Sequence, residues 1–362
     1  MTPSKDEHYM RHALSMARRG LGRVWPNPAV GCVLVKDGHV IAAARTADGG
    51  RPHAEAVVLA AAGAEAKGAT AYVSLEPCSH EGQTGPCAQK LIDAGIRRVV
   101  VACVDPDPRV SGQGIAMLEA AGLQVDKGVL DYKAKQLNAG FFKRITKWQP
   151  AVTLKMAVSA DGMIAAAKGA RTQISGEMAA RYMHHLRSNH DAILVGIGTA
   201  LADDPLLTAR LPGLEHKITR CVMDTHLRLP IMSKLVQSAP DHPLYILHNA
   251  NMSGRSDEVK ALEEKNVKLV GLDNLTPEAV LTKLAKDGIT RLMVEGGAQI
   301  ATSFLEAGVV DEFHLIKSPQ EIGKKGLSAL HGQTLEEALQ SFSLIETRPL
   351  GDDVLEIYKA KH

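Results

Sequence analysis

The first third of the chain carries four residues whose types and order suit a catalytic zinc site. His53 stands two residues before Glu55, and Cys78 and Cys87 follow further along the chain. One imidazole and two thiolates suit tetrahedral zinc with water as the fourth ligand. Zinc lowers the pKa of that water toward neutrality, and a carboxylate such as Glu55 can move its proton to a leaving amine. The pattern predicts hydrolytic deamination of an amino-pyrimidine or purine, for which His-x-Glu followed by Pro-Cys is typical.

Two interpretations without catalysis use the same residues. In the first, His53 is a helix cap, and Cys78 and Cys87 are ordinary buried thiols. In the second, the zinc is structural, which requires a fourth protein ligand in place of the open position. The sequence offers no such ligand at matching spacing, because Cys32 and Cys103 lie within apolar strands and are interpreted as core residues. The order of His-Ala-Glu, a strand and Pro-Cys favours the catalytic interpretation.

The spacing of the two cysteines departs from the usual deaminase motif. Residues 79–86 separate Cys78 from Cys87, whereas the usual motif has two intervening residues. A tRNA or nucleoside deaminase carrying an unrelated partner domain is therefore a further hypothesis. The long insertion and the formal net charge of +2 count against it, because editing enzymes usually combine the short spacing with a basic surface. We expect no nucleic-acid partner.

Length and composition bound the class of protein. The chain has 362 residues, of which 45% are hydrophobic and 23% charged, and this predicts a globular protein of two domains. Its five cysteines form no even, closely spaced disulfide framework, and the N-terminus lacks an apolar signal core. No apolar run reaches membrane-spanning length, so we expect no membrane partner and a cytoplasmic location.

The hydrophobic pattern predicts the elements that position the zinc residues. His53 and Glu55 fall at the start of a helix, Cys78 on the loop after a strand, and Cys87 in the first turn of another helix. Amide N–H groups at a helix start stabilise thiolates. In this part of the chain, we expect helices at 6–19, 53–62, 87–94 and 114–121 and strands at 29–35, 40–44, 70–75 and 98–102.

A second alternation of strands and helices follows a polar, mixed stretch at 132–149. We predict domains at 1–147 and 148–362. The glycine-containing turns 196–199 and 295–298 each follow a strand and suit a phosphate cradle, although neither is a Gly-x-Gly-x-x-Gly dinucleotide motif. In the second domain, we expect strands at 152–157, 192–195, 220–223, 244–247, 267–270, 291–294 and 312–316 and helices at 177–188, 277–286 and 298–307.

One basic residue of the second domain lies where the sequence pattern predicts a buried strand. Lys155 lies inside an apolar strand, between Leu154 and Met156. A lysine is costly to bury without a partner, so its place in the strand favours a role in a site over simple packing.

Four longer segments contain or flank the zinc residues. They are Pro26–Cys32, Gly49–Glu55, Leu75–Cys87 and Asp105–Gly114. They resemble the deaminase domain of the bifunctional deaminase/reductase family of riboflavin biosynthesis, and the resemblance covers nearly all of residues 6–145. The resemblance implies a cytidine-deaminase-like three-layer α/β/α fold. It also implies that the protein removes ammonia from a phosphorylated diaminopyrimidine that carries a ribosylamino group.

The resemblance assigns roles to single residues of the first domain. It implies that His53, Cys78 and Cys87 bind one zinc ion and that Glu55 is the proton shuttle. Further substrate contacts are implied for Asn27, which would hydrogen-bond the ring or ribose, and for the loop around His80 and Gln83.

The second domain resembles the reductase of the same family over roughly residues 150–330. The segments are Leu154–Gly162, Leu186–Arg187, Asp191–Gly196, Thr199–Pro205, Leu207–Arg210, Val294–Gly297 and Val310–Glu312. The resemblance implies a dihydrofolate-reductase-like α/β fold, with a mainly parallel sheet, flanking helices and one antiparallel strand. The implied reaction transfers a hydride from NADPH to the ribose C1′ of the deaminated product, which opens the sugar to a ribityl chain.

The same resemblance implies two groups of site residues. Lys155 would be catalytic, and Arg187 and Arg210 would clamp the 5′-phosphate through their guanidinium forks. The substrate-facing residues would be Lys155, Arg171, Arg187, Leu207, Arg210 and Glu295. The NADPH-binding residues would be Ala157, Gln173, Thr199, Asp203, Thr225 and Gly297.

Departures from the family pattern are larger in the second domain. Residues 171–176 read Arg-Thr-Gln-Ile-Ser-Gly where the family usually has Ser-Gln-Trp-Ile-Thr, and residues 316–319 are more polar than usual. These changes favour an alternative in which the second domain is a non-catalytic binding or assembly module. In the first domain, Thr46, Gln83 and Gly85 replace the commoner His, Arg or Lys, and Pro. Because family members assemble as dimers or tetramers, the resemblance also implies a homo-oligomer.

Overall fold

The computed structural model describes residues 4–80, 85–167, 172–213, 217–251, 256–323 and 325–361. The chain folds into two compact units, Met1–Trp148 and Gln149–His362. In the part of the chain that the structure describes, no helix has both the length and the apolar character needed to cross a membrane.

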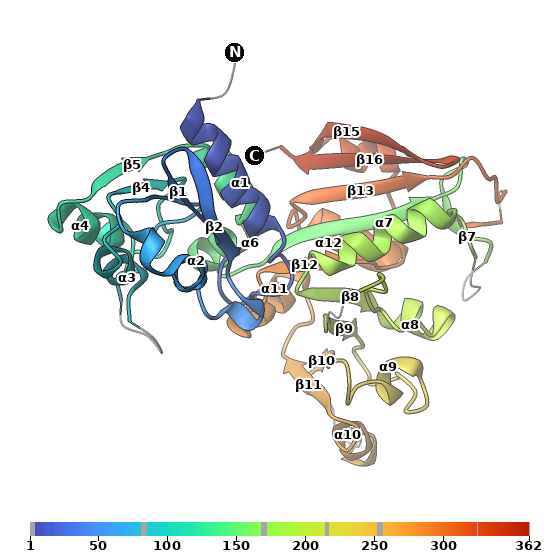
Figure 1. The fold of residues 1–362 in the computed structure, drawn as a ribbon. Helices are drawn as coiled ribbons and strands as arrows, with labels where there is room; N and C mark the ends of the chain where they lie inside the picture. The colour runs from blue at the N-terminus through green and yellow to red at the C-terminus, as the bar shows by residue number, and fades with distance from the viewer. Residues whose placement is uncertain are drawn as a thin grey trace. The chain divides into compact units, whose positions relative to one another are not determined.

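The first unit is built on a five-stranded sheet with the order β2-β1-β3-β4-β5 (Figure 1). Strand β1 is antiparallel to both of its neighbours, β2 and β3, whereas β3, β4 and β5 run parallel. The strands are β1 (Gly31–Lys36), β2 (His39–Arg45), β3 (Thr70–Val73), β4 (Arg98–Val101) and β5 (Gln124–Lys127).

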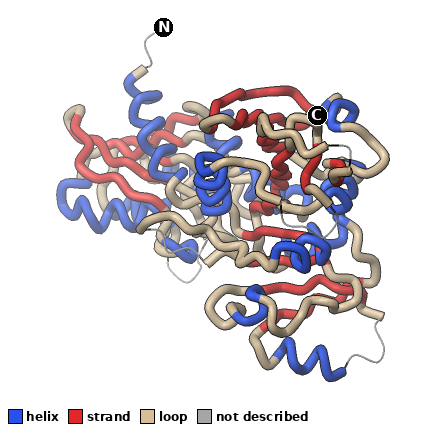
Figure 2. The backbone as a smooth tube through the Cα atoms, turned by 90° about the vertical axis from the view of Figure 1, so that its right-hand side faces the viewer, coloured by secondary structure: helices blue, strands red, loops and turns tan. Residues whose placement is uncertain are grey.

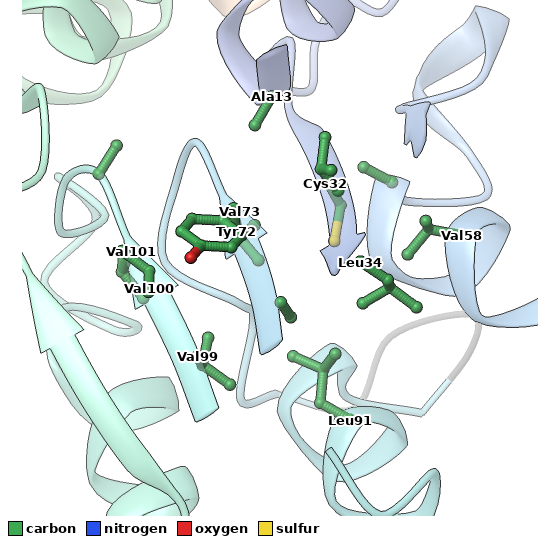
Figure 3. Close-up of a cluster of buried hydrophobic side chains, with 14 of the residues drawn as sticks. Ala13, Cys32, Leu34, Val58, Tyr72, Val73, Leu91, Val99, Val100 and Val101 are labelled. Carbon is green, nitrogen blue, oxygen red and sulfur yellow. The ribbon is translucent and has the colours of Figure 1, made fainter. Parts of the chain in front are cut away.

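Helices cover both faces of this sheet. A Cβ atom at Gly31 would lie 1.9 Å from the Ala13 carbonyl oxygen, so glycine at this position lets helix α1 pack directly on β1. Leu34 points to the opposite face, where Figure 3 shows it beside Val58 and Leu91. The helices are α1 (Lys5–Arg18), α2 (Ala54–Ala62), α3 (Cys87–Asp93), α4 (Gln113–Ala120), α5 (Asp131–Leu137) and α6 (Ala139–Lys147), with 3-10 turns η1 (Asp48–Gly50) and η2 (Gly63–Ala66).

The second unit contains a nine-stranded sheet with the order β11-β10-β9-β8-β12-β6-β13-β16-β15. Strand β16 alone runs against the other eight, because it is antiparallel to both β13 and β15. The strands are β6 (Ala151–Val158), β8 (Ala192–Gly196), β9 (Thr219–Met223), β10 (Leu244–Asn249), β11 (Val267–Leu272), β12 (Arg291–Val294), β13 (Glu312–Lys317), β15 (Phe342–Leu350) and β16 (Asp353–Ala360). A separate pair joins β7 (Met163–Ala165) to β14 (Leu327–Ser328).

Helices also lie on both faces of the large sheet (Figures 1 and 2). Val195 of β8 packs in a cluster with Leu186 of α7, whereas the next residue, Gly196, faces Ile300 of α12 on the other side. The carboxyl ends of the parallel strands β6, β8 and β12 therefore meet at one edge, where ligands bind in such sheets. The helices are α7 (Glu177–Ser188), α8 (Ile197–Asp203), α9 (Lys234–Gln237), α10 (Ser256–Glu263), α11 (Pro277–Lys286), α12 (Ala298–Glu306) and α13 (Leu335–Leu339).

Each helix and strand that the sequence predicts is present, with ends within two residues of the expected positions. The polar, mixed stretch at 132–149, for which no element was predicted, contains most of helix α5 and all of helix α6. The C-terminal hairpin of β15 and β16 was also not expected. Most of β15 is exposed and lacks the alternation of buried and exposed residues that marks a strand.

Candidate active sites

The structure brings the three expected zinc ligands together. The Nδ1 atom of His53 lies 3.7 Å from Cys78 Sγ and 3.4 Å from Cys87 Sγ, and the three ligand atoms all lie within 4.8 Å of one another. Tetrahedral zinc with ordinary bond lengths requires nitrogen–sulfur separations of roughly 3.6 Å. The donors and their spacing therefore fit a single zinc ion.

Local structure explains how residues distant in sequence reach this arrangement. His53 is the N-cap residue of α2, and Cys87 is the first residue of α3. Cys78 lies on the loop after β3 and is held by the start of α3. The backbone N–H of Cys87 donates to Cys78 Sγ at 3.3 Å, and the N–H of Ala88 donates to the Cys78 carbonyl at 3.1 Å. Two helix starts thus surround the metal position, as expected from the sequence.

The pKa values of Cys78 and Glu55 suit metal binding and proton transfer. Hydrogen bonds from Cys87 and His53 lower the pKa of the Cys78 thiol to about 4, so this sulfur is a thiolate at neutral pH. Glu55, in the first turn of α2, is only 3% exposed. Burial raises the pKa of its carboxyl to about 7. A group with a pKa near the working pH can both accept and return a proton.

Of the residues expected to contact substrate in the first domain, the structure describes Asn27 and His80. The side-chain amide of Asn27 donates to the carbonyl of Gly50 at 3.2 Å, which fixes Asn27 beside the segment leading to His53. A Cβ at Gly50 would lie 2.1 Å from the Asn27 amide nitrogen, and its φ of +84° also favours glycine. His80 is exposed at the end of the Cys78 loop, and Gln83 lies outside the described residues.

Thr46, which departs from the family pattern, has a structural partner. Its hydroxyl accepts a hydrogen bond from the Val30 N–H at 3.3 Å and lies 3.4 Å from the Val30 carbonyl. The side chain is 2% exposed, so it closes the open end of the β1–β2 hairpin.

The second unit contains a cavity of about 1160 Å³ at the carboxyl ends of its central strands. This volume is large enough for a dinucleotide cofactor together with a substrate. Of the expected reductase residues, Arg171 lies outside the described part of the chain. The others all line the cavity: Lys155, Ala157, Gln173, Arg187, Thr199, Asp203, Leu207, Arg210, Thr225, Glu295 and Gly297.

A buried ion pair organises the charges of this cavity. Arg187 donates to Glu295 from Nε at 2.6 Å and from a terminal nitrogen at 2.7 Å, and its other terminal nitrogen binds the Thr208 carbonyl at 3.0 Å. Burial alone would raise the pKa of Glu295, but Arg187 holds it below its usual range. Burial lowers the pKa of the Lys155 ammonium, and the charge of Glu295 opposes this shift.

The two glycine-containing turns occupy helix starts that face the cavity. Gly196 is the N-cap of α8 and Gly297 the N-cap of α12, and the Gly297 N–H donates to the Thr199 hydroxyl at 3.1 Å. Free N–H groups at a helix start suit a phosphate. Gly196 also has a packing role, because a Cβ there would lie 2.6 Å from the Ile300 side chain. Leu207, a non-glycine residue with a φ of +51°, holds a strained conformation in the cavity wall.

The sequence interpretation did not single out Glu76, which lies between β3 and Cys78. It is 4% exposed, and its carboxylate accepts four backbone N–H bonds from residues 105–115. A charged residue directly before Pro-Cys, at the end of an apolar strand, was the available signal, because a buried carboxylate requires partners.

Family models match both units. The cytidine and deoxycytidylate deaminase zinc-binding region matches residues 3–103, and the RibD C-terminal domain matches residues 150–355. With the zinc-ligand geometry and the cavity, these matches define the class: a bifunctional enzyme with a zinc-dependent deaminase domain and an NADPH-dependent reductase domain.

Relatives over nearly the full chain identify the family within this class. The chain is 38% identical to the riboflavin biosynthesis protein RibD of Aquifex aeolicus, with 98% of each chain covered. It is also 38% identical to RibD of Escherichia coli, over 97% of this chain and 98% of that protein. The chain belongs to the RibD family of riboflavin biosynthesis enzymes.

Solved structures agree with this assignment. Acinetobacter baumannii RibD superposes with a TM-score of 0.89 at 33% identity and 99% coverage of both chains. A deaminase/reductase from Thermotoga maritima gives a TM-score of 0.87 at 30% identity, again with 99% of both chains covered. The predicted fold class, the two activities in riboflavin biosynthesis and the zinc and NADPH requirements are confirmed. The non-catalytic alternative for the second domain and the nucleic-acid-editing alternative are not supported.

Proposed function

We propose that the protein deaminates diaminohydroxyphosphoribosylaminopyrimidine and then reduces the ribosyl group of the product to ribityl. The observation that carries this proposal is the placement of His53, Cys78 and Cys87 within one ion's reach in the chain that also holds the reductase cavity. The Thermotoga maritima relative bears the name diaminohydroxyphosphoribosylaminopyrimidine deaminase/5-amino-6-(5-phosphoribosylamino)uracil reductase, which supplies the substrate class.

In the deaminase reaction, we assign one role to each first-domain residue. When held by His53, Cys78 and Cys87, zinc supplies the Lewis acid that makes water nucleophilic near neutral pH. The Glu55 carboxylate accepts a proton from the attacking water and returns it to the departing amine. Asn27 and His80 hold the substrate. Both cysteines must stay reduced to bind the ion, so we propose a reducing compartment such as the cytoplasm.

In the reductase reaction, the chain orients the two reactants and controls one proton. When bound, NADPH supplies the hydride. Lys155 Nζ holds a proton at the sugar, and Glu295 fixes the lysine charge. Arg187 keeps the Glu295 carboxylate in place. Substrate contacts are further proposed for Arg171, Leu207 and Arg210, and cofactor contacts for Ala157, Gln173, Thr199, Asp203, Thr225 and Gly297.

The paired state of Arg187 makes Arg210 the better candidate for the substrate phosphate. Arg210 is exposed at the cavity, and among the described residues its guanidinium donates to the Thr208 hydroxyl, at 3.1 Å. A hydrogen bond between charged groups contributes about 1.5–3 kcal/mol. We therefore expect Arg210→Gln to raise the KM for the deaminated substrate by about 10- to 100-fold, with little change in kcat. Steady-state NADPH oxidation measures both.

Arg181→Gln is the matched control for this change. Arg181 lies on the exposed face of α7, where it pairs with Glu177, and it does not line the cavity. Its KM should match the wild type. If Arg210→Gln instead lowered kcat at unchanged KM, Arg210 would act in chemistry and not in phosphate binding.

The two-step proposal is tested by following both products in one reaction. Zinc-loaded protein with the diaminopyrimidine substrate should release ammonia without NADPH. Adding NADPH should then give a loss of nicotinamide absorbance equal to the ammonia released. Feeding the deaminated intermediate directly tests the second step by itself. No NADPH oxidation at any concentration of the intermediate contradicts the reductase assignment and leaves the deaminase assignment standing.

We also propose that the protein is a homo-oligomer. Strand β15 lies at one edge of the nine-stranded sheet, and it exposes Leu344 and Ile345 by 52% and 56% of their surfaces. Exposed edge strands with apolar side chains favour pairing with a second chain. Light scattering after size-exclusion chromatography should give at least twice the chain mass, and a monomer at micromolar concentration contradicts the proposal.

A further inference from the structure

Glu76 makes an unusual set of contacts for a residue two positions from a metal ligand. Its Oε2 atom accepts the N–H groups of Asp105 at 3.2 Å and Gly112 at 2.9 Å. Its Oε1 atom accepts those of Gly114 at 3.0 Å and Ile115 at 3.3 Å. One buried carboxylate thus binds both ends of the loop 105–112 and the first turn of α4.

The residue after Glu76 is pressed against the same helix. A Cβ atom at Gly114 would lie 1.9 Å from the Pro77 carbonyl oxygen, and that neighbour is backbone. The Pro77 segment therefore touches the start of α4 at a distance that glycine alone allows. The Glu76 N–H also donates to the Cys103 carbonyl at 2.9 Å. Glu76 is thus held through its carboxylate and its backbone N–H, and Pro77 through its close packing on α4.

Cys78 is the next residue, and its other side is held by α3 through the Cys87 and Ala88 N–H groups. The position of its sulfur relative to His53 therefore depends on two anchors. One anchor is the start of α3. The other is the Glu76 carboxylate, which binds N–H groups of α4 and of the loop 105–112. Groups that orient metal ligands change metal affinity or activity by about 10- to 100-fold when they are removed.

We propose that Glu76 is a positioning residue of the deaminase, which holds the Pro77–Cys78 segment in register with His53 and Cys87. The inference rests on the proposed zinc deaminase function. A carboxylate suits this task because both of its oxygens accept, and because negative charge is favoured at a helix start. No proton on Glu76 takes part.

Glutamine at this position is the informative substitution. It keeps the length and shape of the side chain, but its NH2 group faces two backbone N–H donors where an oxygen had accepted them. Half of the anchor is lost, and the Cys78 segment is free to shift. The buried amide leaves two backbone N–H groups without an acceptor, which is unfavourable. Glu76→Gln therefore displaces the backbone of the Pro77–Cys78 segment and leaves the zinc-ligand side chains themselves unchanged.

The experiment compares zinc-loaded Glu76→Gln with the wild type and with Glu119→Gln in the full chain. Glu119 is a half-exposed acid on α4 that pairs only loosely with Lys127, at 3.7 Å, so it controls for loss of a negative charge beside the helix that Glu76 binds. The first readout is the rate of zinc transfer to a chromogenic chelator. The second is the absorption spectrum of the cobalt-substituted protein, which reports ligand geometry.

For Glu76→Gln, we expect zinc release about 10-fold faster, an altered cobalt spectrum and a kcat for ammonia release lowered about 10-fold. Reduction of the deaminated intermediate should stay within about twofold of the wild type, because that site lies in the other unit. Glu119→Gln should match the wild type in every readout. Wild-type zinc release and an unchanged spectrum for Glu76→Gln overturn the proposal.

A second variant reaches the same contact from the opposite side. Gly114→Ala keeps every charge but pushes the Pro77 carbonyl away from α4, so it should also speed zinc release. This variant decides the question if Glu76→Gln does not fold. The zinc and cobalt readouts need no substrate, so they stay informative if the wild type turns out to deaminate a different pyrimidine. Failure of the proposed function and failure of this inference are therefore distinguishable.

Discussion

Replacing Glu55 by glutamine is expected to lower kcat for ammonia release by about 100- to 10,000-fold, the range that a positioned proton carrier contributes. Glutamine has the same shape but cannot take up and return a proton. The environment of Glu55 supports this role, because the side chain is buried next to the zinc ligands and burial raises its pKa to about 7. Ammonia release is measured with the zinc-loaded variant at saturating substrate.

Zinc content separates loss of the proton carrier from loss of the metal. Glu55 is not among the three grouped ligands, so elemental analysis of Glu55→Gln should give one zinc per chain, as in the wild type. Reduction of the deaminated intermediate should also be unchanged. Glu65→Gln, which alters an exposed acid of the same unit, is the matched control. Turnover near the wild-type rate in Glu55→Gln would remove this carboxylate from the mechanism.

The sequence predicts the regular elements well because each of them carries a strong local signal. Helices α7 and α11 have the bounds that apolar periodicity predicts, and in α11 the Thr276 cap and Pro277 mark the start. Helices α5 and α6 have no capping side chain at their starts, and α6 was missed although it is strongly amphipathic. Asn138 lies between them, and its amide exchanges two hydrogen bonds with the backbone of Ala29. This contact spans 109 residues and has no trace in the local pattern.

The candidate sites divide in a similar way. Residue types and spacing were enough to predict that His53, Cys78 and Cys87 would come together, as the structure places them, and to propose Glu55 beside them, because metal chemistry restricts which side chains can serve. The reductase residues came from the resemblance to a family, since side chains lining a cavity follow no period along the chain. Neither source revealed that Arg187 is paired with Glu295 or that Glu76 binds four backbone groups. Both features join segments far apart in sequence.

Replacing Lys155 by methionine should abolish NADPH oxidation, with kcat lowered at least about 100-fold, while ammonia release stays within about twofold of the wild type. Lys155 lies on β6 in the wall of the cavity, together with Glu295 and Arg187. Burial lowers the pKa of its ammonium, and the charge of Glu295 opposes this shift. Methionine keeps the apolar stem and removes the proton.

The spared deaminase activity makes this prediction specific to the second unit. Glu295 keeps its ion pair with Arg187 in this variant, so folding should stay intact, and NADPH binding, followed by fluorescence, should weaken far less than kcat falls. Lys268→Met is the matched control, because Lys268 lies on β11, donates to Asp287 and to the Tyr245 hydroxyl, and does not line the cavity. If Lys155→Met lost both activities while Lys268→Met kept them, the deaminase and reductase activities would not be independent of each other. If Lys155→Met kept NADPH oxidation, the proton needed at the sugar must come from another group, and Glu295 would be the next to replace.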